Sequence, residues 1–506
     1  MTVLFRADAS RAIGSGHIMR CLSLASRLAE MKQASVFVCR DITDALSNRI
    51  VDEGHRLISI AKSRSTNDCM SPHITHASWL SCSWQDDAAE TNSIANRENA
   101  GWIIVDHYGL DAQWEKAVSF EGRKIAVIDD LADRPHSCDL LVDQNLRTNA
   151  YARYAELVSQ NCQMLLGPRY ALLRSEFFSP AGVKPRVFVP EPVKFLVAFG
   201  GVDADNFTKL AVECLARICN PKDSVDVVVS SEYASLDELV NRCNGLNWSI
   251  HLNSSELATL MRSADIAIGA GGGMLWERAA TGLPAVVVAV ADNQKEQVSE
   301  AVKRGLILEC DREMFFTESL DRMVENLRLD LELRQKISET CCSVVDGRGA
   351  LRVAQHLKEP GIWLRPAAVS DGGDIYAWRN DPRVRRFSRS SAEIGLADHS
   401  RWLSGVLNDH SKRLLIAEDG DGSLGVVRFD ISGQTAEISI YLVPERIGFG
   451  LGASLLIAAG AWLQSHIPEV KKITAEILPS NKASIELFGS CGYSFDDRLY
   501  VHRIKS

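Results

Sequence analysis

The sequence predicts an α/β protein with two doubly wound halves followed by a smaller α+β domain. Three observations carry this prediction. Short β-branched runs alternate with helical patterns over the first two thirds of the chain, a proline-punctuated stretch at 179–192 divides these runs into two series, and hairpin-like strands replace them from Ile362 onward. Runs that are apolar on both faces and separated by helices are typical of parallel sheets covered on both sides.

The first half opens with a strand, a glycine turn and a helix over 7–30. Its further strands are expected at 34–39, 56–60, 101–106, 124–130 and 138–144, and the polar stretch 63–98 is expected to be a long surface excursion. The second half repeats the pattern at 193–201, 225–231, 248–252, 265–273 and 285–292. Two such halves predict a cleft between them, with ligands at the carboxyl ends of the strands.

The last part of the chain has a different pattern. A run at 413–419 turns through the letters DGDG into 424–432, and a further strand is expected at 435–443. Asp-Gly pairs between alternating segments are typical of antiparallel hairpins. A helix is expected at 452–466, a strand at 471–478 and a second helix at 479–490. The predicted boundaries are therefore 1–185, 186–350, a linker at 351–361, and 362–506.

Composition excludes several classes of function. The net charge is −9 and no basic patch stands out, which argues against nucleic acid as a partner. The 13 cysteines include no C-x-x-C pair and no metal-ligand spacing, so we expect reduced thiols and no metal. Charged residues stand where a signal peptide needs an apolar core, and the apolar run 282–291 is too short to span a bilayer. We expect a cytoplasmic protein that does not bind membranes.

The letters GSGHIM near the amino terminus suggest a catalytic site. Gly14 and Gly16 allow a tight turn, and His17 stands at the start of the first helix, whose free N–H groups point into the expected cleft. An imidazole with its ordinary pKa can take a proton from water at neutral pH. The alternative is a histidine that merely packs or caps the turn.

Six segments in one consistent order carry a resemblance that covers about residues 1–350; they are 5–25, 105–111, 127–145, 165–177, 197–206 and 269–294. Together they resemble the nucleotide-sugar hydrolases of pseudaminic acid biosynthesis, relatives of inverting glycosyltransferases that transfer the sugar to water. The resemblance implies two Rossmann-like halves in a glycosyltransferase-B-like arrangement. It also implies hydrolysis of UDP-2,4-diacetamido-2,4,6-trideoxy-β-L-altropyranose.

The resemblance assigns roles residue by residue. His17 matches the general base for water, with Tyr108 beside the sugar and Asn293 as the third catalytic position, while Glu277 matches the carboxylate that accepts from the uridine ribose. The other UDP-sugar contacts it implies are Arg6, Asp8, Gly14, Gly16, Gly200, Gly201, Gly271, Gly272, Gly273 and Gln294. The glycine run 269–273 suits a loop that cradles phosphate. The chain departs from the family at Met274 and Leu275, where two hydroxyl side chains are usual.

A second glycine loop lies at 448–452, between an expected strand and an apolar helix. With 376–391 and 481–493 it makes residues 362–506 resemble the GNAT superfamily of N-acetyltransferases, whose acetyl donor is acetyl-CoA. The resemblance implies that the fourth strand splays and that acetyl-CoA contacts Val443, Arg446, Gly448, Gly450, Gly452 and Asn481.

The acid and base of the acetyl transfer stay open. Glu437 and Glu476 are candidate bases, and either is equally an ordinary exposed strand carboxylate. Ile447 and Phe488 depart from the GNAT pattern, and Phe488 stands where many members carry the tyrosine that reprotonates the thiolate. Tyr493, or a tyrosine elsewhere such as Tyr441, is the candidate acid.

The two resemblances together predict a bifunctional enzyme. It would N-acetylate the 4-amino group of a UDP-aminosugar and then release UDP from the product. A different 2,4-diamino sugar, a glycosyltransferase fused to a protein N-terminal acetyltransferase of the ribosomal-protein type, and a non-enzymatic nucleotide-sugar sensor are the alternatives.

Overall fold

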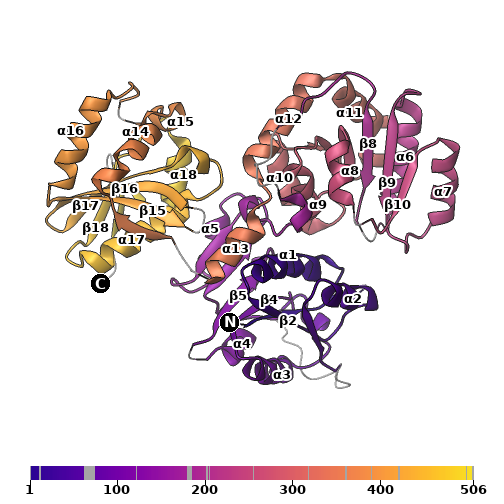
Figure 1. Ribbon diagram of the computed structural model, residues 1–506, viewed down its shortest axis with the longest axis horizontal. Coiled ribbons are helices and arrows are strands. Elements are labelled where there is room, and N and C mark those ends of the chain that lie inside the picture. Colours follow the sequence, from indigo (N-terminus) through magenta and orange to yellow (C-terminus); the bar gives the residue numbers. More distant parts are fainter. Residues whose placement is uncertain are drawn as a thin grey trace. The chain divides into compact units, whose positions relative to one another are not determined.

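The computed structural model divides into two compact units, Met1–Ala354 (unit 1) and Gln355–Ser506 (unit 2). Unit 1 contains two sheets and unit 2 contains one (Figure 1). The structure describes residues 2–10, 13–61, 74–120, 122–178, 185–200, 203, 205–254, 256–316, 318–358, 362–388, 390–419, 422–496 and 499–503.

The first sheet of unit 1 is parallel, in the order β3-β2-β1-β4-β5-β6-β7. Its strands are β1 (Thr2–Ala7), β2 (Ala34–Cys39), β3 (Arg56–Ser59), β4 (Ala100–Asp106), β5 (Lys124–Ile128), β6 (Leu140–Asp143) and β7 (Gln163–Leu166). The helices are α1 (Gly16–Glu30), α2 (Asp44–Asp52), η1 (Ala77–Leu80), α3 (Trp84–Arg97), α4 (Ala112–Val118), α5 (Ala150–Tyr154), η2 (Pro168–Tyr170) and η3 (Ser175–Phe177). The strand order reverses between β1 and β4, the place where doubly wound sheets bind ligands.

The prediction of a long surface excursion at 63–98 is wrong for the second part of this stretch. Residues 62–73 lie outside the described residues, but Trp84–Arg97 forms helix α3, whose start is capped by the Ser83 hydroxyl accepting from the Asp86 N–H at 3.0 Å. Asp87 of this helix is fully buried. Its polar sequence misled the prediction because the buried carboxylate is neutralised by partners distant in the sequence.

The second sheet of unit 1 is also parallel, in the order β10-β9-β8-β11-β12-β13. Its strands are β8 (Lys194–Ala198), β9 (Ser224–Val229), β10 (Ser249–Leu252), β11 (Ile266–Ala270), β12 (Ala285–Val288) and β13 (Leu308–Glu309). The helices are α6 (Phe207–Ile218), α7 (Leu236–Gly245), α8 (Leu257–Ser263), α9 (Met274–Ala280), α10 (Asp292–Lys303), η4 (Met314–Phe316), α11 (Glu318–Leu329) and α12 (Leu331–Val344). The strand order reverses between β8 and β11, and the glycine run follows β11.

Helix α13 (Gly349–Lys358) covers positions that the sequence analysis assigned largely to a linker. Its first residue, Gly349, lies so close to residues 170–171 that a Cβ there would stand 2.2 Å from the Ala171 carbonyl oxygen. Only glycine permits this approach of two backbones. The helix is therefore part of the folded chain and its start is fixed against the first half.

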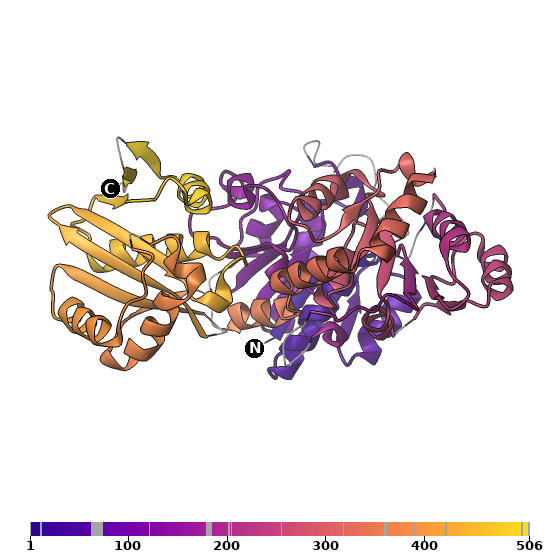
Figure 2. The same cartoon turned by 90° about the horizontal axis from the view of Figure 1, so that it is seen from above.

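Unit 2 is a mixed sheet in the order β14-β15-β16-β17-β18-β20-β19, with its long antiparallel strands seen in orange to yellow in Figure 2. The strands are β14 (Trp363–Pro366), β15 (Lys412–Asp419), β16 (Gly422–Ser432), β17 (Thr435–Leu442), β18 (Lys472–Ala475), β19 (Ser494–Asp496) and β20 (Leu499–Arg503). The helices are η5 (Val369–Asp371), α14 (Gly372–Asn380), α15 (Pro382–Arg385), α16 (Leu396–Leu407), η6 (Pro444–Arg446), α17 (Gly452–His466) and α18 (Lys482–Ser490).

Strands β17 and β18 run parallel, and their pairing covers only Thr435–Glu437, although β17 continues to Leu442. The splayed fourth strand expected from the sequence is therefore present. The half of β17 beyond Glu437 has one edge that no strand among the described residues covers.

Replacing Gly349 by Ala should destabilise unit 1, because the new Cβ would overlap main-chain atoms that cannot rotate away. We expect a loss of about 1–3 kcal/mol in the free energy of unfolding, measured by urea denaturation. Gly245→Ala is the matched control, since a Cβ at this helical glycine meets nothing within 4 Å. A Gly349→Ala protein as stable as this control would contradict the close approach.

Candidate active site

The carboxyl end of β4 places Asp106 beside the start of α1. His17, which is 6% exposed, has its Nδ1 atom 2.5 Å from Asp106 Oδ1. Burial opposes ionisation of Asp106, but the charge of Arg20 and the contact with His17 outweigh it and hold the Asp106 pKa well below its usual value. An ionised carboxylate can only accept, so Nδ1 carries a proton, and in the neutral form of the ring the lone pair lies on Nε2.

Arg20, one turn after His17 on α1, fixes this carboxylate from its other side. Its Nε donates to Asp106 Oδ2 at 2.5 Å, and its Nη2 donates to Asp106 Oδ1 at 2.6 Å. Nη2 also lies 3.4 Å from His17 Nδ1, which is too long to compete with the contact to Asp106. Arg20 Nη1 reaches Asp130 Oδ2 at 3.2 Å. The guanidinium therefore ties together the ends of β4 and β5.

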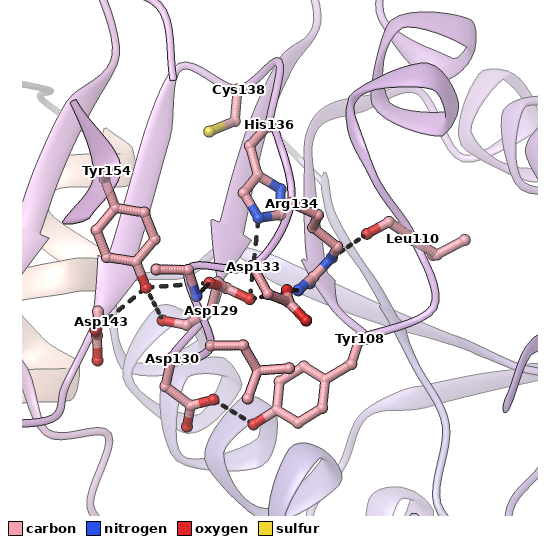
Figure 3. A network of polar contacts seen from close by, with 12 residues as sticks. Tyr108, Leu110, Asp129, Asp130, Asp133, Arg134, His136, Cys138, Asp143 and Tyr154 are labelled. Carbon is pink, nitrogen blue, oxygen red and sulfur yellow. Dashed lines mark hydrogen bonds and ion pairs between the residues drawn. The ribbon is translucent and has the colours of Figure 1, made fainter. Parts of the chain in front are cut away.

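Aromatic rings surround His17. The Tyr108 ring meets it edge-on at a centroid distance of 4.6 Å, and the Tyr108 hydroxyl donates to Asp130 (Figure 3). Trp79 of η1 stacks on Tyr108 at 5.6 Å and lies 6.0 Å from His17, while His76 lies 4.6 Å from Trp79. His17 thus lies among aromatic rings, of which only that of Tyr108 belonged to a predicted site residue.

Arg6 and Asp8, predicted as sugar contacts, are almost completely buried at the end of β1. Arg6 donates to Asp8 Oδ1 at 2.7 Å and to both carboxylate oxygens of Asp87, at 3.0 and 2.7 Å. Asp8 also accepts the main-chain N–H of Arg40 at 2.7 Å. In this structure both side chains are occupied by protein partners at the end of β1, and direct contact with a ligand stays a prediction.

The glycine loop after β11 keeps main-chain donors free. The Gly271 N–H donates to the Val288 carbonyl at 3.0 Å, whereas the N–H groups of Gly272 and Gly273 bond to no described residue. A Cβ on Gly271 would stand 2.2 Å from a methyl of Val298, so α10 packs directly on the loop. These free N–H groups are the donors that a phosphate would need.

The remaining predicted residues of unit 1 lie around this loop or near α1. Gln294 accepts the Val290 N–H at 3.1 Å, and Asn293 is exposed at the start of α10, where its side chain bonds to no described residue. Gly14 and Gly200 have positive φ, 81° and 103°, and a Cβ on Gly16 would meet open space. Gly201 lies outside the described residues.

Glu277 on α9 has one carboxylate oxygen paired and one free. Arg174 Nη2 lies 3.3 Å from Oε1, while Oε2 is buried and bonds to no described residue. Burial raises the Glu277 pKa, and Arg174 opposes the shift only in part. A buried acceptor without a donor costs free energy, so ligand hydroxyl groups would stabilise it.

Two contacts continue from the ends of the first sheet to the second half of unit 1. Asn145, just after β6, donates to Asp130 Oδ2 at 3.3 Å and accepts from Trp276 Nε1 at 3.4 Å. Arg147 Nη1 donates to Glu296 Oε2 at 2.9 Å. The carboxylates around His17 are thereby connected to α9, the helix that carries Glu277.

The loop at 448–452 of unit 2 follows the diverging end of β17. Gly448 and Gly450 have φ of 91° and 74°, and their N–H groups bond to no described residue. Gly452 begins α17, a helix of 15 residues, so donors at this turn and the helix dipole favour an anion here.

The other acetyl-CoA candidates lie nearby but are engaged. Arg446 is buried and donates to Asp419 Oδ1 at 2.6 Å, so its charge is paired within the protein and it links the loop to the end of β15. The Val443 N–H donates to Leu424, and the Asn481 side chain caps α18 by accepting the Ser484 N–H at 3.1 Å. Their contact with a ligand stays a prediction.

The acid and base candidates of unit 2 occupy different environments. Glu437 is half-buried at the last position where β17 pairs with β18, and Glu476 is exposed just beyond β18. Both therefore flank the place where the two strands diverge. Tyr493 is 7% exposed and packs edge-on against Phe488 at 4.9 Å. Tyr441 lies in the half of β17 that pairs with β16 but not with β18, and its hydroxyl is buried without a partner among the described residues. Burial raises the pKa of both phenols.

Comparisons with known proteins agree with this division. Residues 195–343 match the glycosyltransferase family 28 C-terminal domain, and residues 362–494 match the GNAT acetyltransferase domain. A UDP-2,4-diacetamido-2,4,6-trideoxy-β-L-altropyranose hydrolase of Campylobacter jejuni is 26% identical over 61% of this chain and 99% of its own length. This chain is a homologue of that hydrolase with a GNAT domain added at its carboxyl end.

A second relative matches nearly the whole chain. An uncharacterized protein of Methanocaldococcus jannaschii is 23% identical over 97% of this chain and 96% of its own length, so the match extends through both units. The crystal structure of MurG from Acinetobacter baumannii, at 10% identity and a TM-score of 0.50, covers 71% of this chain and 99% of MurG. This likeness supports the glycosyltransferase-B-like fold expected for the hydrolase-like unit 1.

Two classes of feature are absent from the described residues. No helix there is both long and apolar enough to cross a bilayer. No group of three or more His, Cys, Asp or Glu side chains there could hold a metal ion.

Several residues of the hydrolase-like unit were not predicted as site residues. Asp106 and Arg20 hold His17, and Trp79 and His76 pack around it. A signal for Asp106 existed, since it directly precedes the His-Tyr-Gly letters at a strand end, where functional side chains gather. No comparable signal marked Trp79, because its proximity to His17 depends on a connection whose course the sequence pattern does not predict.

A second polar network lies behind the site, around the ends of β5 and β6 (Figure 3). The Tyr154 hydroxyl lies 3.1 Å from Asp129 Oδ2 and 3.2 Å from Asp143 Oδ2. Burial, with the nearby negative charge of Asp130, raises the pKa of Asp143 to about 7. Near pH 5 the folded protein therefore keeps a proton on Asp143 that the unfolded chain releases.

This raised pKa predicts a pH-dependent effect of Asp143→Asn. Between the ordinary carboxyl pKa near 4 and about 7, the folded wild type binds more protons than the unfolded chain, so its stability falls as the pH rises. Asn carries no titrating proton. The free energy of unfolding of the variant should therefore rise relative to that of the wild type by about 1 kcal/mol per pH unit across this range, measured by urea denaturation. Asp237→Asn, at an exposed position, is the control, and a gap that stays constant from pH 5 to pH 8 would contradict the raised pKa.

Proposed function

We propose that unit 1 hydrolyses a UDP-linked 2,4-diacetamido-2,4,6-trideoxyhexose to the free sugar and UDP. The observation that carries the proposal is the 2.5 Å contact between His17 and the buried Asp106 at the switch point of the first sheet. This pair supplies a base with a free Nε2 lone pair. The homology to the Campylobacter jejuni hydrolase supports the same reaction, with UDP-2,4-diacetamido-2,4,6-trideoxy-β-L-altropyranose as the substrate.

The proposed mechanism is a single displacement with inversion. His17 Nε2 takes a proton from water as the water oxygen bonds to the anomeric carbon, and the bond from that carbon to the UDP oxygen breaks. Asp106 stabilises the resulting imidazolium and holds its Nδ1 proton in place. The free N–H groups of Gly272 and Gly273 would stabilise the charge that develops on the departing diphosphate. In this proposal Glu277 accepts from the ribose hydroxyls.

Unit 2 is proposed to acetylate the 4-amino group of the UDP-linked precursor. The amine nitrogen bonds to the thioester carbonyl of acetyl-CoA, the bond from that carbonyl to sulfur breaks, and CoA leaves as a thiolate. Glu437 or Glu476 takes the proton that the nitrogen loses, and a tyrosine returns one to the sulfur. The free N–H groups of Gly448 and Gly450 would bind the pyrophosphate of acetyl-CoA.

The two activities form a sequence, because acetylation supplies the second acetamido group of the sugar that unit 1 releases. Their fusion raises the local concentration of the intermediate. The full-length likeness to the Methanocaldococcus jannaschii protein supports a lasting association of the two units.

A glycosyltransferase is the second candidate for unit 1. The match of residues 195–343 to the glycosyltransferase family 28 C-terminal domain favours it, since the same fold can present a sugar acceptor in place of water. The two candidates differ in a simple way. A hydrolase releases UDP and free sugar with no acceptor present, and a glycosyltransferase does not.

Replacing His17 by Ala should lower the kcat of UDP release about 10²–10⁴-fold and leave UDP binding intact, because only the base is removed. Asp106→Asn should cause a loss of similar size by freeing the ring to take the wrong tautomer. His251→Ala is the control, since it removes another histidine–aspartate contact, His251 Nε2 to Asp226 at 2.8 Å, in the second sheet. Unchanged turnover in His17→Ala would remove this residue from its assigned role.

The order of the two steps can be followed by NMR with the UDP-aminosugar and acetyl-CoA. We expect a new acetamide methyl signal first and the free-sugar anomeric signal afterwards. His17→Ala should stop the sequence at the diacetylated UDP-sugar, since unit 2 is untouched. Release of unacetylated sugar ahead of any acetamide signal would contradict this order.

A further inference from the structure

Unit 2 contains two arginines, Arg379 and Arg385, with buried nitrogen atoms that have no hydrogen-bond partner among the described residues. Arg379, near the end of α14, forms no ion pair with any described residue, and its Nη1 is buried without a hydrogen-bond partner among them. Arg385 of α15 has a buried, unpartnered Nε, and its closest carboxylate oxygen, on Glu393, is 3.9 Å away. Buried donors that bond to nothing are costly, so a fold keeps them where a ligand satisfies them.

Arg379 and Arg385 lie on two short helices, α14 and α15, that contact each other. Burial lowers the pKa of Arg379, and the positive charge of Arg385 lowers it further. Two like charges with no anion beside Arg379 raise the free energy of the folded state. An anion placed between them would remove both the repulsion and the missing hydrogen bonds.

A third donor, the hydroxyl of Tyr441, belongs to a ring that packs next to α14. Tyr441 packs with Trp378 against the core under α14 and α16, and its buried hydroxyl has no partner among the described residues. Trp378 directly precedes Arg379 in α14, so the Tyr441 ring packs against the same core as the segment that carries Arg379. Tyr441 belongs to the half of β17 that diverges from β18, two residues before Val443. The three donors therefore adjoin the end of the sheet where acetyl transfer is proposed.

The turn that carries the arginines is held rigidly. Asn380 donates to the Ile394 carbonyl and accepts its N–H, both at 2.9 Å. Asp381 accepts the Arg383 N–H at 2.8 Å and pairs with the Arg383 guanidinium at 2.8 Å. One arginine of this segment thus has its own carboxylate, while Arg379 has none.

We propose that Arg379, Arg385 and Tyr441 form an anion-binding site that holds the diphosphate of the amine acceptor. Arginine pairs well with phosphate oxygens, and a phenol donates a further hydrogen bond. The choice of a diphosphate rests on the function proposed above, in which the acceptor is a UDP-linked aminosugar. A protein amino terminus would bring no anion of this kind. The site therefore selects nucleotide-linked amines over neutral ones.

Acetyl transfer by the full chain tests the site directly. At saturating acetyl-CoA, Arg379→Gln should raise the KM for the UDP-aminosugar at least tenfold, with the KM for acetyl-CoA unchanged. With the free aminosugar, which has no diphosphate, the same variant and the wild type should react equally. Arg386→Gln is the matched control, because Arg386 is an exposed arginine of the same segment. An unchanged acceptor KM in Arg379→Gln would overturn the proposal.

Inorganic pyrophosphate gives a second test that does not depend on the acceptor. With CoA saturating, so that its own site is filled, pyrophosphate should raise the unfolding temperature of the wild type. The increment should fall by more than half in Arg379→Gln, Arg385→Gln and Tyr441→Phe, but not in Arg386→Gln. Equal increments in all variants would overturn the anion site. A loss of the increment in a protein that does not acetylate the UDP-aminosugar would support the anion site and refute the proposed acceptor.

Discussion

A single buried carboxylate, that of Asp106, holds together the end of unit 1 where catalysis is proposed. It lies fully buried where the strand order of the first sheet reverses, and it accepts hydrogen bonds from His17 and Arg20 of α1. A buried charge is stable only when it is paired and hydrogen-bonded, so its ionised state and the position of α1 depend on each other. The tautomer of His17 follows from this arrangement. Without the carboxylate, Arg20 would be a buried cation lacking its main partner, and the ring of His17 would have no fixed proton.

The hydrogen bonds do not stop at Asp106. Arg20 continues to Asp130, which also accepts from Tyr108 and Asn145, and Asn145 meets Trp276 beside Glu277. A continuous polar path thus joins the proposed base of the first half, His17, to the helix proposed to hold the nucleoside in the second. Such a path has a physical use, since a ligand that satisfies Glu277 also stabilises the position of Trp276. The remaining partners of the path are short side chains at strand ends, which leave little room for alternative arrangements.

The sequence predicted the elements whose signal is local. Apolar runs such as 193–201 and 285–292 gave the parallel sheets, and the glycines at 448–452 marked the loop after the splayed strand. The failures were non-local. Helix α3 has a polar sequence, and nothing within it indicates that Asp87 is buried, because its partners Arg6 and Arg40 are 81 and 47 residues away. Arg446 likewise reads as a free cation until the fold brings Asp419 to it. Charge pairing between distant segments decides such cases, and no periodicity encodes it.

The two units share one feature that bears on specificity. Where a ligand is proposed, each has buried polar atoms without a partner among the described residues, but the atoms are of opposite kinds. Unit 1 offers a carboxylate oxygen of Glu277, which needs donors, and unit 2 offers Arg379 and Tyr441, which need acceptors. A nucleoside diphosphate carries both complements, donors on its ribose and acceptors on its phosphates. A site with unsatisfied groups rejects analogues that lack the matching ones more strongly than an apolar pocket does, because those analogues leave the groups unpaired. Under the proposed function, Glu277 of unit 1 recognises the ribose of the nucleotide, whereas Arg379 and Tyr441 of unit 2 recognise its phosphates. Both units therefore discriminate against a sugar that carries no nucleotide.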